Sequence, residues 1–369
     1  SHSGMVGNIY LRDAAGGNTN VGVITATAFV PTTGQLSHRN IIVNGAMIIS
    51  QRGTSSTTSG YGSVDRFQCN FNGADEAMTH TQHTLTSSDT GPYAQGFRKS
   101  FHVQNGNQTG GAGASDWMRV WHKFEAQDIA SSGWDYTSPS SYLTLSFWVK
   151  ASVAQTYYVQ LATQDGTSKM YYFAMNLSAN TWTKITHSLP GHADLTFDND
   201  TGEGLYIAWY AFRGTNNTGT VTANQWNTFS GSTLTPNQTS TWWTTNDSTY
   251  EITGVQLEVG PVATPFEHRS FGDELSRCKR YLQPYIQYAE YVSGGTGNLG
   301  FPYTAFTVPM RASPTFVSDH ESKSSNWSFA SMQVQGSDAY GYYAYAISYN
   351  TTNSNYGYMR RYGKASAEL

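Results

Sequence analysis

The stretch "YEITGVQLEVGPVATPFEHRSFGDELSRCKRYLQP", residues 250–284, begins with the pattern of a strand and ends with that of a helix. Over residues 250–260, apolar side chains alternate with small or polar ones, which is the period-two pattern of a β-strand. The residues expected on one face of this strand are Thr253, Val255, Leu257 and Val259. Pro261 and Pro265 then exclude both a helix and a central strand. The sequence therefore predicts a strand, a short irregular link and a new element after it.

A helix is expected after this link. Ser270 is a favourable N-cap residue, and Asp273 stands three residues later, in capping-box spacing. Apolar residues then recur at helical spacing on one stripe: Phe271, Leu275, Cys278 and Leu282. Pro284 is expected to end the helix, because proline lacks the amide hydrogen that a helix interior needs. We therefore predict one clear helix, over residues 270–284, that connects two β-rich parts.

Period-two alternation dominates the chain from Asn40 onward, and loops rich in Gly and polar residues separate the alternating runs. The clearest runs are "GFRKSFHV" (96–103), "DWMRVWHKF" (116–124), "YLTLSFWVK" (142–150), "KMYYFAMN" (169–176) and "GLYIAWYAF" (204–212). This spacing predicts an all-β fold, an antiparallel jelly-roll sandwich. The expected parts are a cloning scar with an N-terminal stalk (1–39), the sandwich (40–269), the connector helix (270–284) and a small C-terminal β domain (285–369).

Composition excludes several classes of protein. Only 12% of the 369 residues are charged, against about 25% in an average domain. The net charge is −4 and no basic stripe is present, so nucleic-acid binding is not expected. The longest apolar run, residues 205–212, is far shorter than the roughly 20 residues of a membrane helix, so membrane insertion is not expected. Two cysteines, Cys69 and Cys278, cannot form a disulfide framework.

The triplet Glu267, His268 and Arg269 inside the link has two interpretations. It is either a general acid/base cluster or a joint whose charges pair with the helix or with a neighbouring chain. A catalytic base needs a partner within hydrogen-bond reach and a cleft, and the sequence shows neither. We therefore expect a joint, with no catalytic residues.

Acidic residues cluster in "DLTFDNDTGEG", residues 194–204. Calcium prefers oxygen-rich loops, so Asp198 and Asp200 are candidate Ca²⁺ ligands. Gly202 is misplaced for an EF-hand, and no Glu closes a twelve-residue loop. A solvated polar loop is the alternative, and no other cofactor is expected.

Aromatic residues are the remaining candidates for binding. Four tryptophans lie in polar surroundings, where an exposed ring serves sugar stacking or a subunit interface: Trp134, Trp226, Trp242 and Trp243. Near the C-terminus, "DAYGYYAYAISYN" and "NYGYMRRYG" alternate tyrosines with small residues, and the intervening "NTTNS" predicts a hairpin. The candidate receptor contacts there are Trp327, Tyr343, Tyr345, Tyr349, Tyr356 and Tyr358, with Arg360 as a polar anchor. A tyrosine-lined trimer core is the alternative.

Several segments together resemble a family of phage tail-fibre and tail-associated proteins, found in marine cyanophages and prophages. These segments are "NIIVNGAMIISQRG" (40–53), "SVDRF" (63–67), "LSFWVKAS" (145–152), "GVQLEVGPVATPFEHRSFGDELSRCKRYLQ" (254–283), "VPMRASPTF" (308–316) and "ASAEL" (365–369). More distantly, "NIIVNGAM" and "YEITGVQLE" resemble the first and last strands of jelly-roll carbohydrate-binding modules. Those modules often carry an Asp pair near a structural calcium, and Thr253 and Gly254 stand at the matching positions here.

The resemblance implies a non-enzymatic receptor-binding protein of the virion tail, exposed outside the host cell. Its implied partners are two further copies of itself in a homotrimer, other tail proteins on the N-terminal side, and a glycan or protein of the host surface. A structural spacer of the virion is the first alternative. A tail depolymerase, which would be a glycoside hydrolase, is the second.

Overall fold

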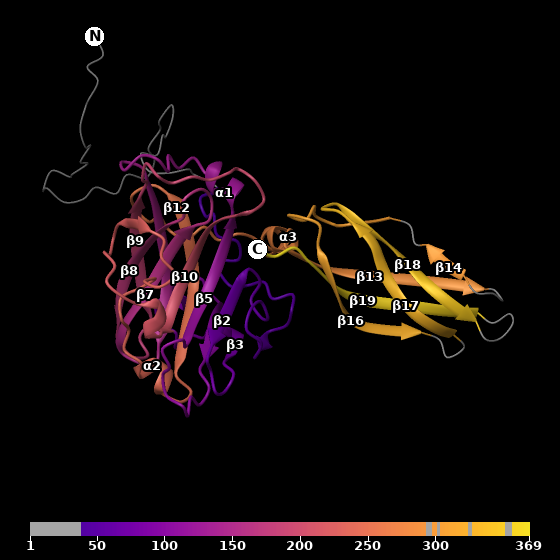
Figure 1. Ribbon diagram of the computed structural model, residues 1–369, viewed down its shortest axis with the longest axis horizontal. Coiled ribbons are helices and arrows are strands. Elements are labelled where there is room, and N and C mark those ends of the chain that lie inside the picture. Colours follow the sequence, from indigo (N-terminus) through magenta and orange to yellow (C-terminus); the bar gives the residue numbers. More distant parts are fainter. Residues whose placement is uncertain (1–37, 293–296, 301–302, 324–326, 351–355) are drawn as a thin grey trace, which may run out of the picture. The chain divides into compact units, whose positions relative to one another are not determined.

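The computed structural model describes residues 38–292, 297–300, 303–323, 327–350 and 356–369. Residues 1–37 of the expected stalk lie outside this range. Two six-stranded sheets form the first part of the fold (Figure 1), and every named pair of strands in them is antiparallel. The first sheet has the order β1 (Ser55–Ser56), β3 (Thr79–Thr84), β4 (Lys99–Gln104), β12 (Thr249–Val259), β6 (Tyr142–Ala151) and β9 (Thr183–Pro190). The second has the order β11 (Trp226–Thr228), β8 (Lys169–Leu177), β7 (Gln155–Thr163), β10 (Glu203–Arg213), β5 (Trp117–Glu125) and β2 (Phe67–Asn72).

One hydrophobic core joins the inner faces of the two sheets, as the sandwich prediction requires. On β6, the four residues predicted to face inward are each at most 1% exposed: Leu143, Leu145, Phe147 and Val149. The ring of Phe147 meets that of Trp209 on β10, with centroids 5.7 Å apart. The inward side chains of both sheets therefore share one core, and the all-β class is confirmed.

The alternation predicted for β12 is wrong at one point. Ile252 and Val255 both belong to the core, although they lie three positions apart. The register against β6 shifts between Thr253 and Gln256, which marks a β-bulge. Gly254 supplies the positive φ, 62°, that the bulge uses. The extra residue changes the phase of the strand, so Thr253 does not share a face with Val255.

Three short helices lie among the strands of the described residues: α1 (Ala126–Ala130), α2 (Thr241–Thr244) and α3 (Phe271–Lys279). Two 3-10 turns lie at Tyr93–Gln95 and Thr215–Asn217. The predicted connector helix is present as α3, and α1 and α2, of five and four residues, are too short for a periodic pattern to reveal them. The expected cap of α3 is confirmed, because the Ser270 hydroxyl accepts the amide of Asp273 over 3.2 Å.

The helix α3 ends earlier than predicted. Its last residue is Lys279, and β13 already begins at Leu282. Pro284 lies inside β13, opposite Lys364 of β19. This position tolerates proline because β13 is an edge strand with a single neighbour. The predicted apolar stripe is also incomplete, since Phe271 is 60% exposed.

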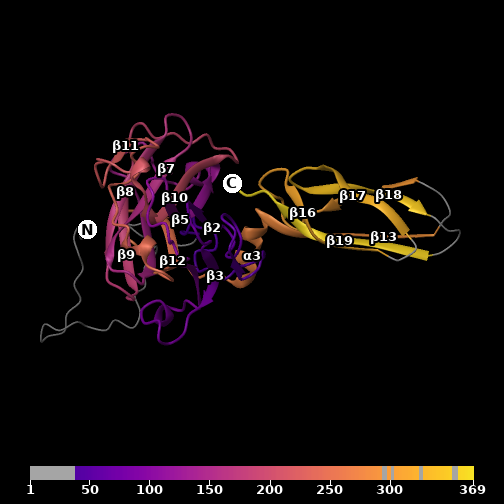
Figure 2. The ribbon, with the colours of Figure 1, turned by 60° about the horizontal axis from the view of Figure 1, so that its bottom comes forward.

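A smaller pair of sheets follows α3. One contains β13 (Leu282–Val292), β19 (Tyr356–Ser366) and β16 (Thr315–Lys323). The other contains β14 (Gly297–Gly300), β18 (Gly341–Asn350), β15 (Thr304–Ala305) and β17 (Trp327–Ser337). The predicted hairpin is wrong, because its two arms, β18 and β19, belong to different sheets (Figure 2). Alternation shows that a run is a strand but does not identify its neighbour.

The C-terminal residues return to the start of this smaller part and to the sandwich. The amide of Ala367 donates to the carbonyl oxygen of Tyr281 over 2.8 Å. Glu368 forms ion pairs with Arg66, and with Arg52 at 3.1 Å. The ending "ASAEL" therefore has a structural role, because it ties β19 to two arginines of the sandwich.

The β12 bulge predicts a specific sensitivity to a single methyl group. A Cβ on Gly254 would lie 2.6 Å from the ring of Phe97 and would occupy an unfavourable positive φ. We expect Gly254→Ala to lower the free energy of unfolding by about 2 kcal/mol or more. Chemical denaturation of both proteins measures the difference.

The matched control is Gly272→Ala in α3, where a Cβ meets nothing within 4 Å. Because alanine has a higher helix propensity than glycine, this variant should be as stable as the original protein or up to about 1 kcal/mol more stable. Equal effects of the two substitutions would contradict the role assigned to the bulge.

Candidate functional site

The triplet Glu267, His268 and Arg269 is engaged in structural contacts. Glu267 accepts the amide of Asn40 over 2.9 Å and pairs with Arg269 at 3.2 Å. Arg269 also donates to the carbonyl oxygen of Ile42 and pairs with Glu274 of α3 at 3.5 Å. These contacts tie the first described residues of the sandwich to the link and the helix, as the joint interpretation predicts.

His268 completes this joint. Its Nε2 lies 3.0 Å from the carbonyl oxygen of Gln95, and its ring packs against Phe97 and Phe266. A carbonyl oxygen accepts a proton donor, so this nitrogen carries the ring hydrogen and is not a free base.

The tryptophans selected from their polar neighbours are buried, so the expectation that they are exposed is wrong. Trp242 and Trp243 are 0% exposed, and Trp134 and Trp226 are 3% and 8% exposed. Three of the indole N–H groups donate to backbone carbonyl oxygens: Trp226 to Pro190, Trp242 to Thr249 and Trp243 to Gly111. Polar neighbours in sequence did not reveal that these rings fill the core and are unavailable for stacking on a ligand.

The two candidate calcium ligands, Asp198 and Asp200, take part in hydrogen bonds within their own loop region. Asp200 accepts the amide of Gly202 over 2.7 Å, and the amide of Asp198 donates to Asp165. Burial, together with the charges of Asp198 and Asp200, raises the pKa of Asp165. Among the described residues, no three His, Cys, Asp or Glu side chains gather to hold a metal.

The candidate contacts of the C-terminal part fall into two groups. Tyr343 is 44% exposed on β18, and Arg360 is exposed on β19, with its guanidinium 5.0 Å from the ring of Tyr362. The side chains of the others lie outside the described residues: Trp327, Tyr345, Tyr349, Tyr356 and Tyr358. Since β18 and β19 belong to different sheets, the two tyrosine runs do not share one hairpin face.

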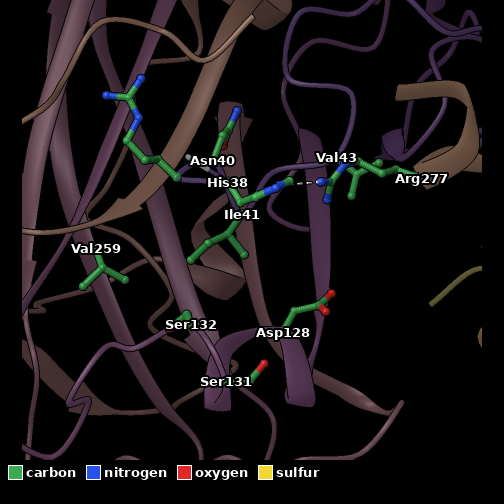
Figure 3. A pocket seen from close by; sticks show the side chains of 10 residues that line it. His38, Asn40, Ile41, Val43, Asp128, Ser131, Ser132, Val259 and Arg277 are labelled. Atoms are coloured by element: carbon green, nitrogen blue, oxygen red, sulfur yellow. Dashed lines mark hydrogen bonds between the residues drawn. The ribbon is translucent and has the colours of Figure 1, made fainter. Parts of the chain in front are cut away.

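A cavity of about 290 Å³ lies beside the first described residues (Figure 3). Its lining includes Asp128 and the pair His38–Arg277, in which Arg277 donates to Nδ1 of His38 over 3.2 Å. Burial and the neighbouring Glu125 raise the pKa of Asp128 to about 6. Glu125 itself is fully engaged by Arg280, with two contacts of 2.6 Å. Among the described residues that line this cavity, Asp128 is the one carboxylate.

The outer face of the second sheet has a different character. On β5, Met118, Val120 and Phe124 point into the core, so the intervening residues point outward. We name the outward residues of three adjacent strands the aromatic–cation face: Gln68, Asn70 and Asn72 of β2, Trp117, Arg119, Trp121 and Lys123 of β5, and Tyr206, Tyr210 and Arg213 of β10. The run "WMRVWHK" (117–123), which alternation predicts to be a strand, encodes the central row of this face.

Cations and rings alternate along β5. The guanidinium of Arg119 lies 3.5 Å from the ring centroid of Trp121 and 4.9 Å from that of Trp117. The ammonium of Lys123 lies 4.2 Å from the Trp121 ring, on the other side along the strand. Tyr206 meets Trp121 edge-on, with centroids 5.2 Å apart. These contacts hold half-buried rings in fixed positions on a β-strand.

The loop after β10 covers one half of this sheet. Leu234, with Val221 and Phe229, packs against outward residues of β7, β8 and β10. The carbonyl oxygen of Val221 accepts the hydroxyl of Tyr172 over 2.5 Å. The remaining half, formed by β2, β5 and the adjoining edge of β10, keeps Trp117, Trp121 and Asn70 partly exposed.

Several polar groups on this uncovered half have no partner. Four buried side-chain atoms there lack a hydrogen bond within the described residues: Asn70 Oδ1, Arg119 Nε, Trp121 Nε1 and Arg213 Nε. A buried polar atom without a partner costs about 1–3 kcal/mol. Rings, amides and unsatisfied donors on one rigid face are the groups that bind a sugar, whose own surface combines C–H patches with hydroxyls.

No protein-family model and no curated protein matches the sequence. Among solved structures, the chain is similar to the enzymatically active domain of tailspike protein 4 of bacteriophage CBA120, with 11% identity and a TM-score of 0.32 over 60% of this chain. The chain spans about a fifth of that tailspike domain, 21%.

It is also similar to the CBM22-1 xylan-binding domain of Paenibacillus barcinonensis Xyn10C, with 9% identity and a TM-score of 0.28 over 63% of this chain and 100% of that one. The family 11 carbohydrate-binding module of Clostridium thermocellum Lic26A-Cel5E gives 10% identity and a TM-score of 0.28 over 58% and 98%. These scores are too low to transfer a function, so the proposal below depends on the residues of this chain.

The raised pKa of Asp128 predicts a pH-dependent stability difference. Because the folded protein holds this proton more tightly than the ordinary value of 3.8, ionisation of Asp128 costs stability above about pH 6. Asp128→Asn should therefore be more stable than the original protein at pH 8, by about 1 kcal/mol or more. The advantage should shrink as pH falls from 6 to 4. Denaturation curves at these pH values measure it, and a pH-independent difference would contradict the assignment.

Proposed function

We propose that this protein binds carbohydrate without cleaving it, and that the aromatic–cation face holds the sugar. The observation that carries the proposal is the row Trp117, Arg119, Trp121 and Lys123 on one rigid strand, with unsatisfied polar groups beside it. The indole rings supply apolar surface for the C–H face of a sugar ring. The amides of Asn70 and Asn72 supply donors and acceptors for its hydroxyls.

The position of this face on paired strands fits a binding role. Side chains on a sheet keep their spacing through the hydrogen-bonded register, and Trp121 stands opposite Gln68 on one side and Ala208 on the other. A saccharide chain laid along β5 would therefore meet two indoles, Trp117 and Trp121, with the outward side chain of Arg119 between them.

The biological setting that we propose is adhesion of a phage tail fibre to a bacterial surface glycan. The resemblance of segments such as 40–53 and 254–283 to tail-associated proteins supports it. The virion spacer and the tail depolymerase remain alternatives. A depolymerase would release reducing ends from a surface polysaccharide, whereas a spacer would bind none.

We further propose that the chain acts as a homotrimer. Exposed apolar residues on the outer side of the β13–β19–β16 sheet support an intermolecular contact: Ile286 is 57% exposed, Tyr288 50% and Val317 59%. Three large apolar side chains exposed on one small sheet are candidates for a contact between copies of the chain.

The binding proposal is tested by Trp121→Ala. Loss of the central ring should weaken binding to a glycan selected by array screening about tenfold, which corresponds to about 1.4 kcal/mol. Calorimetric titration of the full chain measures the affinity, and Tyr343→Ala examines the C-terminal alternative. Loss of binding in Tyr343→Ala with none in Trp121→Ala would move the site to β18.

Trp182→Ala is the matched control. Trp182 is also half-buried and lies 4.6 Å from a lysine ammonium, that of Lys150, but it directly precedes β9 of the first sheet, away from the aromatic–cation face. It should leave glycan affinity unchanged.

The assembly proposal is tested by light scattering. A mass of three chains is expected at micromolar concentration, and Val317→Lys should lower it by placing a charge in an apolar contact. A monomer in the unaltered protein would refute the trimer without affecting the binding face.

A further inference from the structure

Two guanidinium groups on the aromatic–cation face have no counter-ion. Arg213 is 4% exposed, yet it makes no ion pair or hydrogen bond with the described residues. Its contacts are with rings, at 4.2 Å from Tyr210 and 5.9 Å from Trp117. Arg119 likewise contacts Trp117 and Trp121 and makes no ion pair within the described part of the chain.

Two other partly buried cations of the sandwich, Lys150 and Lys123, form ion pairs. Lys150 lies 3.0 Å from Glu251 and 3.1 Å from Asp89 on the first sheet. On the aromatic–cation face itself, Lys123 lies 2.7 Å from Glu203. Burying a charge without a partner is costly, and a ring offsets only part of that cost. Arg119 and Arg213 are therefore placed to receive an anion from outside the chain.

The strand register brings these two arginines together. Arg213 stands opposite Trp117, and Arg119 stands opposite Tyr210. Both guanidinium groups contact the ring of Trp117, at 4.9 Å for Arg119 and 5.9 Å for Arg213. A planar guanidinium stacked on a ring keeps its N–H donors in its own plane. Two parallel N–H groups there match the two oxygens of a carboxylate or sulfate.

A small cavity adjoins Arg213. Its volume is about 220 Å³, and its lining includes Gln238 and Ser240 besides Arg213. Gln238 Oε1 is buried and lacks a donor within the described residues. The volume is smaller than the roughly 300 Å³ of a small-molecule site, so the cavity suits one substituent of a larger ligand. Arg213 would receive an anionic group there, and Gln238 would accept a hydroxyl.

We infer that this face selects an anionic sugar, one that carries a carboxylate or a sulfate, and that Arg213 and Arg119 are the residues that recognise it. This inference rests on the proposed carbohydrate-binding function and specifies its ligand class. Glu203 of β10 lies beside this face, and its charge is already matched by Lys123.

Titration of the full chain with three soluble polysaccharides tests the inference: neutral dextran, dextran sulfate and polygalacturonate. At least one anionic polymer should bind about tenfold more tightly than dextran, and this preference should weaken with salt. The sulfate and uronate arms distinguish the two anions. Polyglutamate, an anionic polymer without sugar, should bind more weakly than the preferred polysaccharide.

Arg213→Met should reduce affinity for the preferred anionic polymer about tenfold or more and abolish the preference over dextran. Arg213→Lys should retain more of the affinity than Arg213→Met, because lysine keeps the positive charge but lacks the paired N–H donors of arginine. Arg98→Met is the matched control, since Arg98 also stacks on a tyrosine, Tyr93, at 4.0 Å, but is exposed and lies before β4. If Arg213→Met does not fold, Arg119→Gln serves in its place.

The outcomes separate the inference from the proposed function. Equal binding of neutral and anionic polymers, lowered by Trp121→Ala but not by Arg213→Met, would overturn the inference and keep the carbohydrate site. An equal loss of affinity for the anionic polymer in Arg98→Met would overturn the inference, because the preference would then come from non-specific charge attraction. Failure of the unaltered protein to bind any glycan, on an array or in titration, would overturn both.

Discussion

The buried guanidinium of Arg66 is the constraint on which the connection between sandwich and C-terminal part depends. It is 1% exposed, lies 3.4 Å from the ring centroid of Tyr281 and pairs with Glu368. Burial opposes its charge, but Glu368 and the phenols of Tyr61 and Tyr281 raise its pKa above the usual value. A permanent buried cation requires its carboxylate, so the last residues of the chain must return to the sandwich.

A second buried ion pair fixes the same region. Glu125, at the end of β5, is 0% exposed and receives both Arg280 and the hydroxyl of Tyr281 at 2.6–2.7 Å. The strand that displays Trp117 and Trp121 is therefore anchored at its far end by residues after α3. Removal of either charge would leave the other buried and unpaired, which is more costly than loss of an exposed pair.

The proposed binding face is held rigidly by these contacts, and some of its buried polar atoms lack a hydrogen bond within the described residues. Core contacts below β5 and the loop packed over β7 and β8 leave one half-sheet uncovered. Its cations either meet a carboxylate, as Lys123 does, or meet rings alone, as Arg119 and Arg213 do. On such a surface the strands hold the side chains at fixed spacing, which is the preorganisation that a binding site needs.

The sequence by itself determined the all-β class, the inward residues of β6 and the cap at Ser270, because these follow from short-range periodicity and local hydrogen bonding. The tertiary structure decided which strands are neighbours and which side chains are buried. The bulge at Gly254 reversed the phase of β12, and the edge position of β13 admitted Pro284. Tryptophans with polar neighbours, such as Trp242, proved to be core, while the outward row of "WMRVWHK" became the candidate site. Burial and strand partnership depend on contacts between residues far apart in sequence, which periodicity does not encode.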